Sequence, residues 1–540
     1  MIIISLVFIF FGLYILFINK LFIYEWIIYN LDSIKINLIV VIRFKLLIFI
    51  FLVILICSII LLYRVSYINL NNKYLIKRFY YLIILFLLSI IFLILRPNIL
   101  TLLLGWDGLG LISYCLIIYY QKNLAFNSGI LTVILNRLGD SRLLIIISFI
   151  IIFGRWNLIL YNINLLILII FLIIVFRKSA QLIFIIWLPA AIIAPTPVSS
   201  LVHSSTLVTA GIYLLINYEI LIDLKYKEYI LVISRITIFI SGVIANFEID
   251  FKKIIALSTL SQLGFIIRIY SLGIVNLTFL HLFIHAFFKS IIFICVGSLI
   301  HYIRGIQNFR FYSGIYYLYP IKGLLIIFSL IILCGFPFLV GFYSKDLIVE
   351  YYFLNKIRIF RLLNLIIGTI FTVSYSFRLI FILIINSFII NLIYSDEDNI
   401  IMNYIILILL IILFIRKFVF NFFFFHIRVN LFYIFKYFVF KIMFLGFIFS
   451  LLIFNTNFLS KVILLIKSFF IIDFFYKFIL NYLIYWLIFY EIYFEKGIIE
   501  KFTGKFIDFF RYLFEINYRL KIFYILLMYI YLLILILLYN

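Results

Sequence analysis

Three protonatable side chains recur at a fixed spacing within one strongly apolar segment. The stretch HLFIHAFFKS places His281, His285 and Lys289 four residues apart, which puts all three on one face of an α-helix. At 1.5 Å per residue they extend over about 12 Å of the helix axis. Because histidine ionises near neutral pH, such a ladder is suited to pass protons along a membrane interior.

The ladder has two other interpretations. Histidines four residues apart can share a zinc ion, as in the HExxH motif, but no glutamate or third typical ligand lies nearby and Lys289 would repel a cation. The three side chains can also be packing residues that hydrogen-bond to neighbouring helices. The sequence favours a proton relay, leaves packing open and predicts no metal site.

The elements that must position this ladder are membrane-spanning helices. Of the 540 residues, 68% are hydrophobic and the mean hydropathy is +1.33, whereas soluble domains are about half apolar. Uncharged runs such as 46–63 and 522–539 match the roughly 20 residues that cross a hydrocarbon core. The alternation typical of transmembrane β-barrels is missing. We predict an all-α polytopic membrane protein with about 14–16 transmembrane helices, residues 1–18 being the first rather than a signal peptide.

The chain is basic, with a net charge of +24 from 44 Lys and Arg against 20 Asp and Glu. The basic residues mostly lie in short connections such as 71–78, as expected of residues that set membrane topology, so we expect no nucleic-acid partner. The four cysteines show no metal or redox spacing. They are Cys57, Cys115, Cys295 and Cys334.

Other charges interrupt apolar segments. Asp107 lies in LLLGWDGLGLISYCLIIYY and Lys178 lies in IIVFRKSAQLIF. A charge at the bilayer centre costs about 2.5–3.5 kcal/mol, so such residues usually face a partner or water. The alternatives are that Asp107 lies at a helix end in the headgroup region and that Lys178 extends to the membrane surface. A buried lysine can change its charge with its carboxylate partner, whereas Arg177 stays charged.

Two further residues carry weaker signals. Asp140 follows Arg137 by three residues, so a local ion pair is as good an interpretation as a proton carrier. His203 is either a proton carrier or a hydrogen-bonded packing residue. Hydroxyl residues able to hold water surround it: Ser204, Ser205, Thr206 and Thr209.

Prolines and glycines mark where helices are interrupted or pack closely. Three prolines cluster at 189–197, after Lys178, and Pro337 precedes Lys345; paired interrupted helices are typical of transporters. The glycines around Asp107 indicate close helix packing rather than a nucleotide loop, because no βαβ unit surrounds them. They are Gly105, Gly108 and Gly110.

The C-terminal region has an amphipathic pattern. From 494 to 521, apolar residues recur at helical spacing and charges fill the opposite side. This pattern predicts a helix that lies along a membrane surface or a partner. The uncharged run up to 539 would then return through the bilayer.

Six segments resemble, in order, the antiporter-like chain 5 family of respiratory NADH:ubiquinone oxidoreductase (complex I). They are GWDGLGLISYCLIIYY, NRLGDSRLL, KSAQLIFIIWLPAAIIAPTPVSSLVHSSTLVTAGIYLL, DFKKIIALSTLSQLGF, HLFIHAFFKSIIFICVGSLIH and GFPFLVGFYSKDLIVE. Together they cover about residues 100–350, and the KSAQ to VTAG block is highly specific. The first hundred residues and those beyond about 395 resemble the family only in hydropathy.

The resemblance implies an antiporter-like fold with two inverted repeats, each containing a broken helix. We therefore expect N-terminal transmembrane helices over 1–97, a proton-translocating core over 98–390 and additional transmembrane helices over 391–459. A lateral amphipathic helix over 460–520 and a transmembrane anchor over 521–540 would follow.

Carried over motif by motif, the resemblance also implies a proton path. Its residues are Asp107, Asp140, Lys178, His203, His281, His285, Lys289, Lys345 and Asp346. The acid at Asp107 would pair with Lys178, but the family often has glutamate there, so the shorter aspartate leaves room for a bridging water. A distant redox event would alter this pair, and protons would pass through the histidines to Lys345.

The same resemblance implies the setting. It places the chain in the mitochondrial inner membrane among lipids and other membrane-arm subunits, especially the chain 4 antiporter-like subunit. NADH, FMN, iron–sulfur clusters and ubiquinone would bind other subunits and none would bind this chain. Two alternatives remain: a subunit of a stand-alone multisubunit cation/proton antiporter, although such subunits usually carry longer C-terminal membrane regions, and a non-conducting scaffold.

Overall fold

The computed structural model describes most of the chain between residues 73 and 385 and smaller parts elsewhere. The described residues are 7, 22–30, 35–42, 50, 53–54, 56–57, 73–95, 98–151, 165–185, 187–191, 194, 196–201, 206–303, 305–337, 339–354, 359–385 and 438–455. The chain divides into two compact units, Met1–Ile463 and Leu464–Asn540. His203, the lateral helix expected over 460–520 and the anchor expected over 521–540 lie outside the described residues.

The N-terminal part contains a β-hairpin. Strand β1 (Phe22–Asn30) pairs antiparallel with β2 (Lys35–Ile42). We expected transmembrane helices throughout 1–97, and at these two segments the structure has strands instead. Both are rich in Ile, Val, Tyr and Trp, which favour strands, and hydropathy alone does not separate an apolar strand from an apolar helix.

Apart from this hairpin, every described element is helical, which confirms the all-α membrane fold. The longer helices are α3 (Lys73–Leu95), α4 (Ile99–Ile117), α5 (Asn123–Ile151), α6 (Leu165–Lys178), α9 (Leu207–Asn217), α10 (Leu224–Phe247), α11 (Phe251–Ser271), α12 (Val275–Tyr302), α14 (Pro320–Cys334), α15 (Val340–Leu354), α16 (Ile359–Ile385) and α20 (Phe438–Asn455). Short helical turns are η2 (Ile118–Tyr120), η4 (Leu182–Phe184), α7 (Trp187–Ala191), α8 (Thr196–Ser199), η6 (Glu219–Leu221), η7 (Phe309–Tyr312) and α13 (Ile315–Leu318).

Among the described residues, six helices are long and apolar enough to cross a membrane: α3, α4, α10, α11, α12 and α16. Nearly every residue of α11 and α12 is buried within the protein. A helix that is apolar on all sides and buried on all sides belongs to the centre of a bundle. Polar side chains on α11 and α12 are therefore shielded from lipid by other helices.

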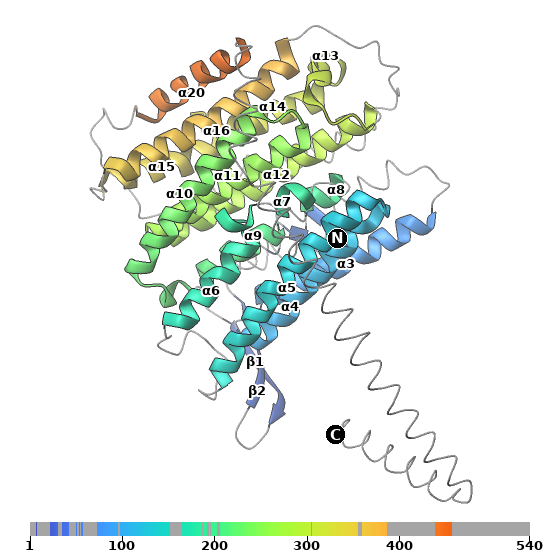
Figure 1. The fold of residues 1–540 in the computed structure, drawn as a ribbon, viewed down its shortest axis with the longest axis vertical. Coiled ribbons are helices and arrows are strands. Elements are labelled where there is room, and N and C mark those ends of the chain that lie inside the picture. The colour runs from blue at the N-terminus through green and yellow to red at the C-terminus, as the bar shows by residue number, and fades with distance from the viewer. Residues whose placement is uncertain are drawn as a thin grey trace, which may run out of the picture. The chain divides into compact units, whose positions relative to one another are not determined.

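Packing follows the order of the chain. Helix α4 packs on α3 and α5, α5 packs on α6, and α6 packs on α9. Further along, α11 packs between α10 and α12, α12 contacts α14 and α15, and α16 packs against α10, α14 and α20. Figure 1 shows the first group in blue to teal and the second in green to orange.

Each group contains one interrupted helix. Helix α6 ends at Lys178 in a turn where Ala180 has φ +53°, and η4, α7 and α8 follow before α9 begins. Helix α14 ends at Cys334, where Gly335 has φ +86° and leads toward α15. The left-handed conformation at Gly335 is a common way to end a helix. The interruptions predicted from the prolines are present, although α6 already ends ahead of its proline cluster.

The glycines near Asp107 differ in how closely they are packed. A Cβ added at Gly105 would lie 2.6 Å from the Leu93 backbone N, and one at Gly108 would lie 3.0 Å from the Ser89 Cβ. At Gly110 the nearest atom would be 3.6 Å away, an ordinary contact. Close packing of α3 on α4 therefore explains Gly105 and Gly108 but not Gly110.

This difference predicts the outcome of a paired substitution. Gly105→Ala forces the α3 and α4 backbones apart and should lower the free energy of unfolding by about 1–3 kcal/mol. Gly110→Ala should be neutral or stabilising, because alanine favours a helix over glycine by about 1 kcal/mol. The thermal unfolding midpoint of the purified chain in detergent measures both, and an equal loss in the two variants would contradict the packing explanation.

Candidate functional site

Lys178 is buried at the last position of α6. Its side chain is 2% exposed, and its Nζ lies 4.6 Å from the centroid of the Trp106 ring on α4. Helix α9 approaches closely here, because a Cβ on Gly211 would lie 2.9 Å from the Val175 carbonyl oxygen. This burial excludes the interpretation in which Lys178 extends to the membrane surface.

Two acids act on Lys178 without touching it. Asp107 on α4 is half-buried, Asp140 on α5 is buried, and both interact electrostatically with Lys178. Within the described part of the chain, the ion pairs closer than 4.0 Å involve other lysines and arginines. Asp107 and Lys178 therefore do not form the direct contact pair expected of a matched acid and lysine. The separation agrees with the shorter reach of aspartate.

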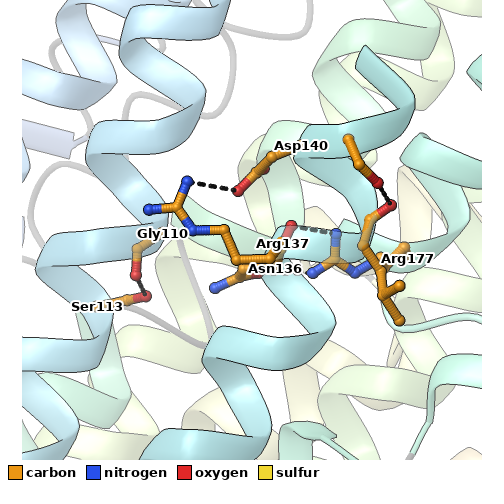
Figure 2. A network of polar contacts seen from close by, with 8 residues as sticks. Gly110, Ser113, Asn136, Arg137, Asp140 and Arg177 are labelled. Carbon is orange, nitrogen blue, oxygen red and sulfur yellow. Dashed lines mark hydrogen bonds and ion pairs between the residues drawn. The ribbon is translucent and has the colours of Figure 1, made fainter. Parts of the chain in front are cut away.

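Arg177 joins α6 to α5 beside this group. Its Nη1 donates to the Asn136 carbonyl oxygen at 2.6 Å and its Nη2 donates to Asn136 Oδ1 at 3.3 Å. Figure 2 shows Arg177 reaching Asn136 on α5. A Cβ on Gly139 would lie 2.0 Å from Nη1, so the guanidinium passes directly over Gly139 on α5, and any larger residue there would make the end of the arginine side chain shift. This contact fixes the α5 turn that carries Asp140.

Asp140 lies between the exposed Arg137 and the buried Lys178. It forms an ion pair with Arg137 at 3.9 Å, but the Arg137 side chain is 56% exposed, and exposed pairs contribute only about 0–1 kcal/mol. Asp140 also faces the interior, where Lys178 and Arg177 act on it. We call Trp106, Asp107, Asp140, Arg177 and Lys178 the Lys178 cluster.

The second cluster centres on His281, which joins α12 to α11 and α15. Its Nδ1 lies 2.9 Å from Ser344 Oγ and its Nε2 lies 3.4 Å from Gln262 Oε1. In a neutral ring, a proton on Nε2 leaves Nδ1 to accept from the Ser344 hydroxyl. When both nitrogens carry protons, the hydroxyl can donate instead to the Gly341 carbonyl oxygen, 3.1 Å away. Ser344 is thus able to serve both charge states of His281.

The other two members of the ladder have contrasting surroundings. Lys289 Nζ donates to Ser258 Oγ on α11 at 2.5 Å. His285 is 0% exposed, and neither of its ring nitrogens has a hydrogen-bond partner among the described residues. Hydrogen-bonded packing therefore describes His281 and Lys289 but not His285. No group of three metal-binding side chains occurs within the described residues.

Lys345 is held by the end of another helix. Its Nζ donates to the carbonyl oxygens of Leu333 at 2.5 Å and Cys334 at 3.4 Å, and it lies 3.5 Å from Thr372 Oγ1. These carbonyls are at the C-terminus of α14, which carries a partial negative charge. The interrupted helix thus supplies the counter-charge of the ammonium. Asp346 follows it in α15 and is half-buried. We call Ser258, Gln262, His281, His285, Lys289, Ser344 and Lys345 the His–Lys cluster.

Several contributors to these clusters were missed by the sequence reasoning. Trp106, Ser258, Gln262, Ser344 and Thr372 are neutral, and single neutral polar or aromatic residues give no signal in an apolar helix. One signal was available: Ser258 and Gln262 are four residues apart and therefore share a face of α11.

A further buried lysine also went unnoticed. Lys322, in the first turn of α14, is 1% exposed and donates to the Tyr302 hydroxyl at 2.7 Å. Its Nζ lies 4.1 Å from the centroid of the Tyr302 ring. It lies among aromatic residues, outside both clusters as defined above.

Comparison with known proteins places these features in a family. A family model described as the transmembrane region of the NADH:quinone oxidoreductase/Mrp antiporter proteins matches residues 97–372. The chain is 58% identical over 308 residues to NADH-ubiquinone oxidoreductase chain 5 of Apis mellifera ligustica, covering 57% of this chain and 56% of that one. It is 44% identical over 344 residues to the protein of that name from Anopheles arabiensis, covering 62% and 89%.

A further relative and a solved structure are also similar to this chain. The chain 5 protein of Locusta migratoria is 46% identical over 364 residues, covering 66% of this chain and 63% of that one. The aligned stretches thus span little more than half of the honeybee and locust proteins. In fold, the chain matches a structure of the Mrp complex from Dietzia sp. DQ12-45-1b with a TM-score of 0.71 and 21% identity, covering 83% of this chain and 52% of that chain.

The contact between Lys178 and Trp106 predicts an energetic coupling. A desolvated cation–π pair contributes about 2 kcal/mol. A double-mutant cycle of Trp106→Leu and Lys178→Met, followed by thermal unfolding, should therefore show a coupling of about that size. Tyr312→Leu is the control, because Tyr312 is a buried aromatic residue of the second helix group, where its ring packs edge-on against Phe251. Its cycle with Lys178→Met should be additive within about 0.5 kcal/mol. Equal coupling in both cycles would contradict the cation–π assignment.

Proposed function

The chain belongs to the family of NADH:quinone oxidoreductase and Mrp antiporter transmembrane subunits, and from this premise we propose that it is a proton-translocating membrane-arm subunit of respiratory complex I. It would couple electron transfer from NADH to ubiquinone to proton pumping. The observation that carries the proposal is the row of buried bases in the His–Lys cluster, of which His281, Lys289 and Lys345 are held by hydroxyl, amide and carbonyl groups rather than by carboxylates.

Neutral partners allow a buried base to exist in either protonation state. A carboxylate against a buried ammonium stabilises the charged form strongly. Hydroxyl and carbonyl groups bond to the protonated base, and a hydroxyl can also donate to the deprotonated base. Lys289 beside Ser258 and His281 beside Ser344 can therefore gain and lose a proton with a partner in either state. Buried ionisable residues inside membrane helices usually mark such a pathway.

The Lys178 cluster would act as the input. Lys178 lies in the field of Asp107 and Asp140 and against Trp106, without a contact ion pair among the described residues. Because the acids act on the lysine through space, a small displacement of either acid changes the free energy of the charged lysine without having to break a contact ion pair. We infer that a distant redox event acts in this way and that Lys178 changes its protonation in response.

The His–Lys cluster would then carry the proton onward. His281 and His285 are one helical turn apart on α12, and Lys289 is one turn further. Lys345, at the interruption between α14 and α15, would be the last group of the path, with Asp346 beside it. The contribution proposed for His203 rests on its motif.

The wider assignment follows from the relatives. Their printed names assign them to NADH-ubiquinone oxidoreductase, so we propose the mitochondrial inner membrane as the location of this chain. Other membrane-arm subunits, including the chain 4 antiporter-like subunit, would be its partners. NADH, FMN, the iron–sulfur clusters and ubiquinone would bind elsewhere in the complex.

A stand-alone cation/proton antiporter subunit is the second candidate, and the fold match to the Mrp complex favours it. That match is at 21% identity and concerns the fold alone. The chain 5 relatives reach 58% identity, which supports complex I. Sodium-dependent transport without NADH oxidation would favour the stand-alone antiporter over the complex I subunit.

Removal of the input lysine tests the proposal. Lys178→Ala should lower the number of protons pumped per electron while the complex assembles normally. Lys253→Ala is the control, because Lys253 forms a half-exposed ion pair with Asp250 and its loss should leave pumping unchanged. Proton uptake and NADH oxidation, measured together in membrane vesicles, give the ratio. Full stoichiometry in an assembled Lys178→Ala complex would refute the proposed function.

Removal of the hydroxyl beside His281 tests the path. Ser344→Ala leaves Nδ1 without its partner, a loss of about 1–1.5 kcal/mol that should slow pumping about tenfold. Ser290→Ala is matched in burial, but its hydroxyl donates to Phe287 on its own helix, so its pumping rate should stay normal. If both variants pump at the same rate, Ser344 has no part in proton transfer.

A further inference from the structure

The turn that follows Lys178 is tied to α10 by one side chain. Gln181 is 1% exposed, and its Nε2 donates to the Ser179 carbonyl oxygen at 3.1 Å. Its Oε1 accepts from Thr237 Oγ1 at 2.9 Å. Ser179 is bonded directly to Lys178, so a shift of the lysine backbone acts at once on the Gln181 amide.

Thr237 has a second acceptor within reach. Its single hydroxyl proton can go to Gln181 Oε1 or to the Ser234 carbonyl oxygen on its own helix, 2.8 Å away. The bond between α10 and Gln181 can therefore break while the Thr237 hydroxyl keeps an acceptor. Gln181 Oε1, in contrast, would lose the hydrogen that Thr237 donates to it. Buried Thr259 on α11, by comparison, donates to the Ala256 carbonyl oxygen on its own helix.

The other side of Thr237 lies against α11. A Cβ on Gly264 would be 2.7 Å from Thr237 Oγ1 and 2.8 Å from Ile238 Cγ1, so α10 and α11 meet closely at this hydroxyl. Two residues earlier on α11, Gln262 contacts His281 Nε2. Buried contacts joined by short stretches of backbone thus lead from Lys178 to His281.

We propose that Gln181 and Thr237 are positioning residues that couple the Lys178 cluster to the His–Lys cluster through their hydrogen bond and the Thr237–Gly264 contact. Neither a glutamine amide nor a threonine hydroxyl titrates near neutral pH, so they hold geometry rather than carry protons. A change at Lys178 shifts the Ser179 carbonyl, and the Thr237 hydroxyl then exchanges its two acceptors. The packing at Gly264 transmits this exchange toward Gln262. This proposal rests on the proposed function, because its test measures proton pumping.

The test uses the assembled complex in membrane vesicles. Thr237→Val keeps the shape and removes the hydroxyl, and Gln181→Met removes the same bond from the other side. Each should lower the protons pumped per electron while NADH oxidation continues. The double variant should lose no more than Gln181→Met alone, because Gln181→Met already removes the bond to Thr237 together with the bond to the Ser179 carbonyl oxygen. Thr237→Ser should restore the ratio, and the matched control Thr259→Val should leave it unchanged.

Several results would overturn the coupling. These are a full ratio in Thr237→Val and Gln181→Met, additive losses in the double variant, the same loss in Thr259→Val, or failure of both single variants to assemble. Lys178→Ala, measured in parallel, separates a failure of the coupling from a failure of the proposed function. If it loses pumping while Thr237→Val does not, only the coupling is wrong; if it pumps fully, the proposed function itself is wrong.

Discussion

The structure depends on keeping ionisable bases inside an apolar helical core. A bare ammonium in such surroundings is strongly unfavourable, and a carboxylate partner would hold it in one charge state. In the His–Lys cluster the partners are instead hydroxyls, an amide and helix-end carbonyls. This requirement explains why α11 and α12 are enclosed almost completely: they carry the bases and the neutral groups that hold them.

Interrupted helices supply part of this environment. Backbone groups away from regular helices are tolerated in a membrane only where protein satisfies them. At the end of α14, Lys345 satisfies two carbonyls that the helix leaves open, and the helix dipole favours its charge. At the end of α6, Gln181 bonds the Ser179 carbonyl in the turn after Lys178. At the end of α14 the buried lysine itself satisfies the free carbonyls, whereas at the end of α6 a glutamine satisfies the carbonyl next to the buried lysine.

The two clusters differ in their use of acids. Asp107 and Asp140 both act on Lys178, whereas the partners of Lys289 and Lys345 within the described residues are neutral. Acids at a distance make a lysine sensitive to displacement, and neutral partners let a base exchange protons in place. In the proposed function, this difference would separate the lysine that senses charge movement from the groups that transmit protons.

The sequence by itself determined the class of the protein and the positions of Lys178, His281, His285, Lys289 and Lys345 as bases in apolar segments, because hydropathy and a rare charge are properties of single residues and their neighbours. The spacing of His281, His285 and Lys289 placed them correctly on one face, since helical geometry is local. Only the tertiary structure decided their partners. Ser344 carries no pattern in its helix, and the four-residue spacing of Ser258 and Gln262 does not say which base they meet, because these partners are chosen by contacts between segments far apart in the chain. The β1–β2 hairpin was missed for a related reason: an apolar run fits a strand or a helix until its neighbours select one.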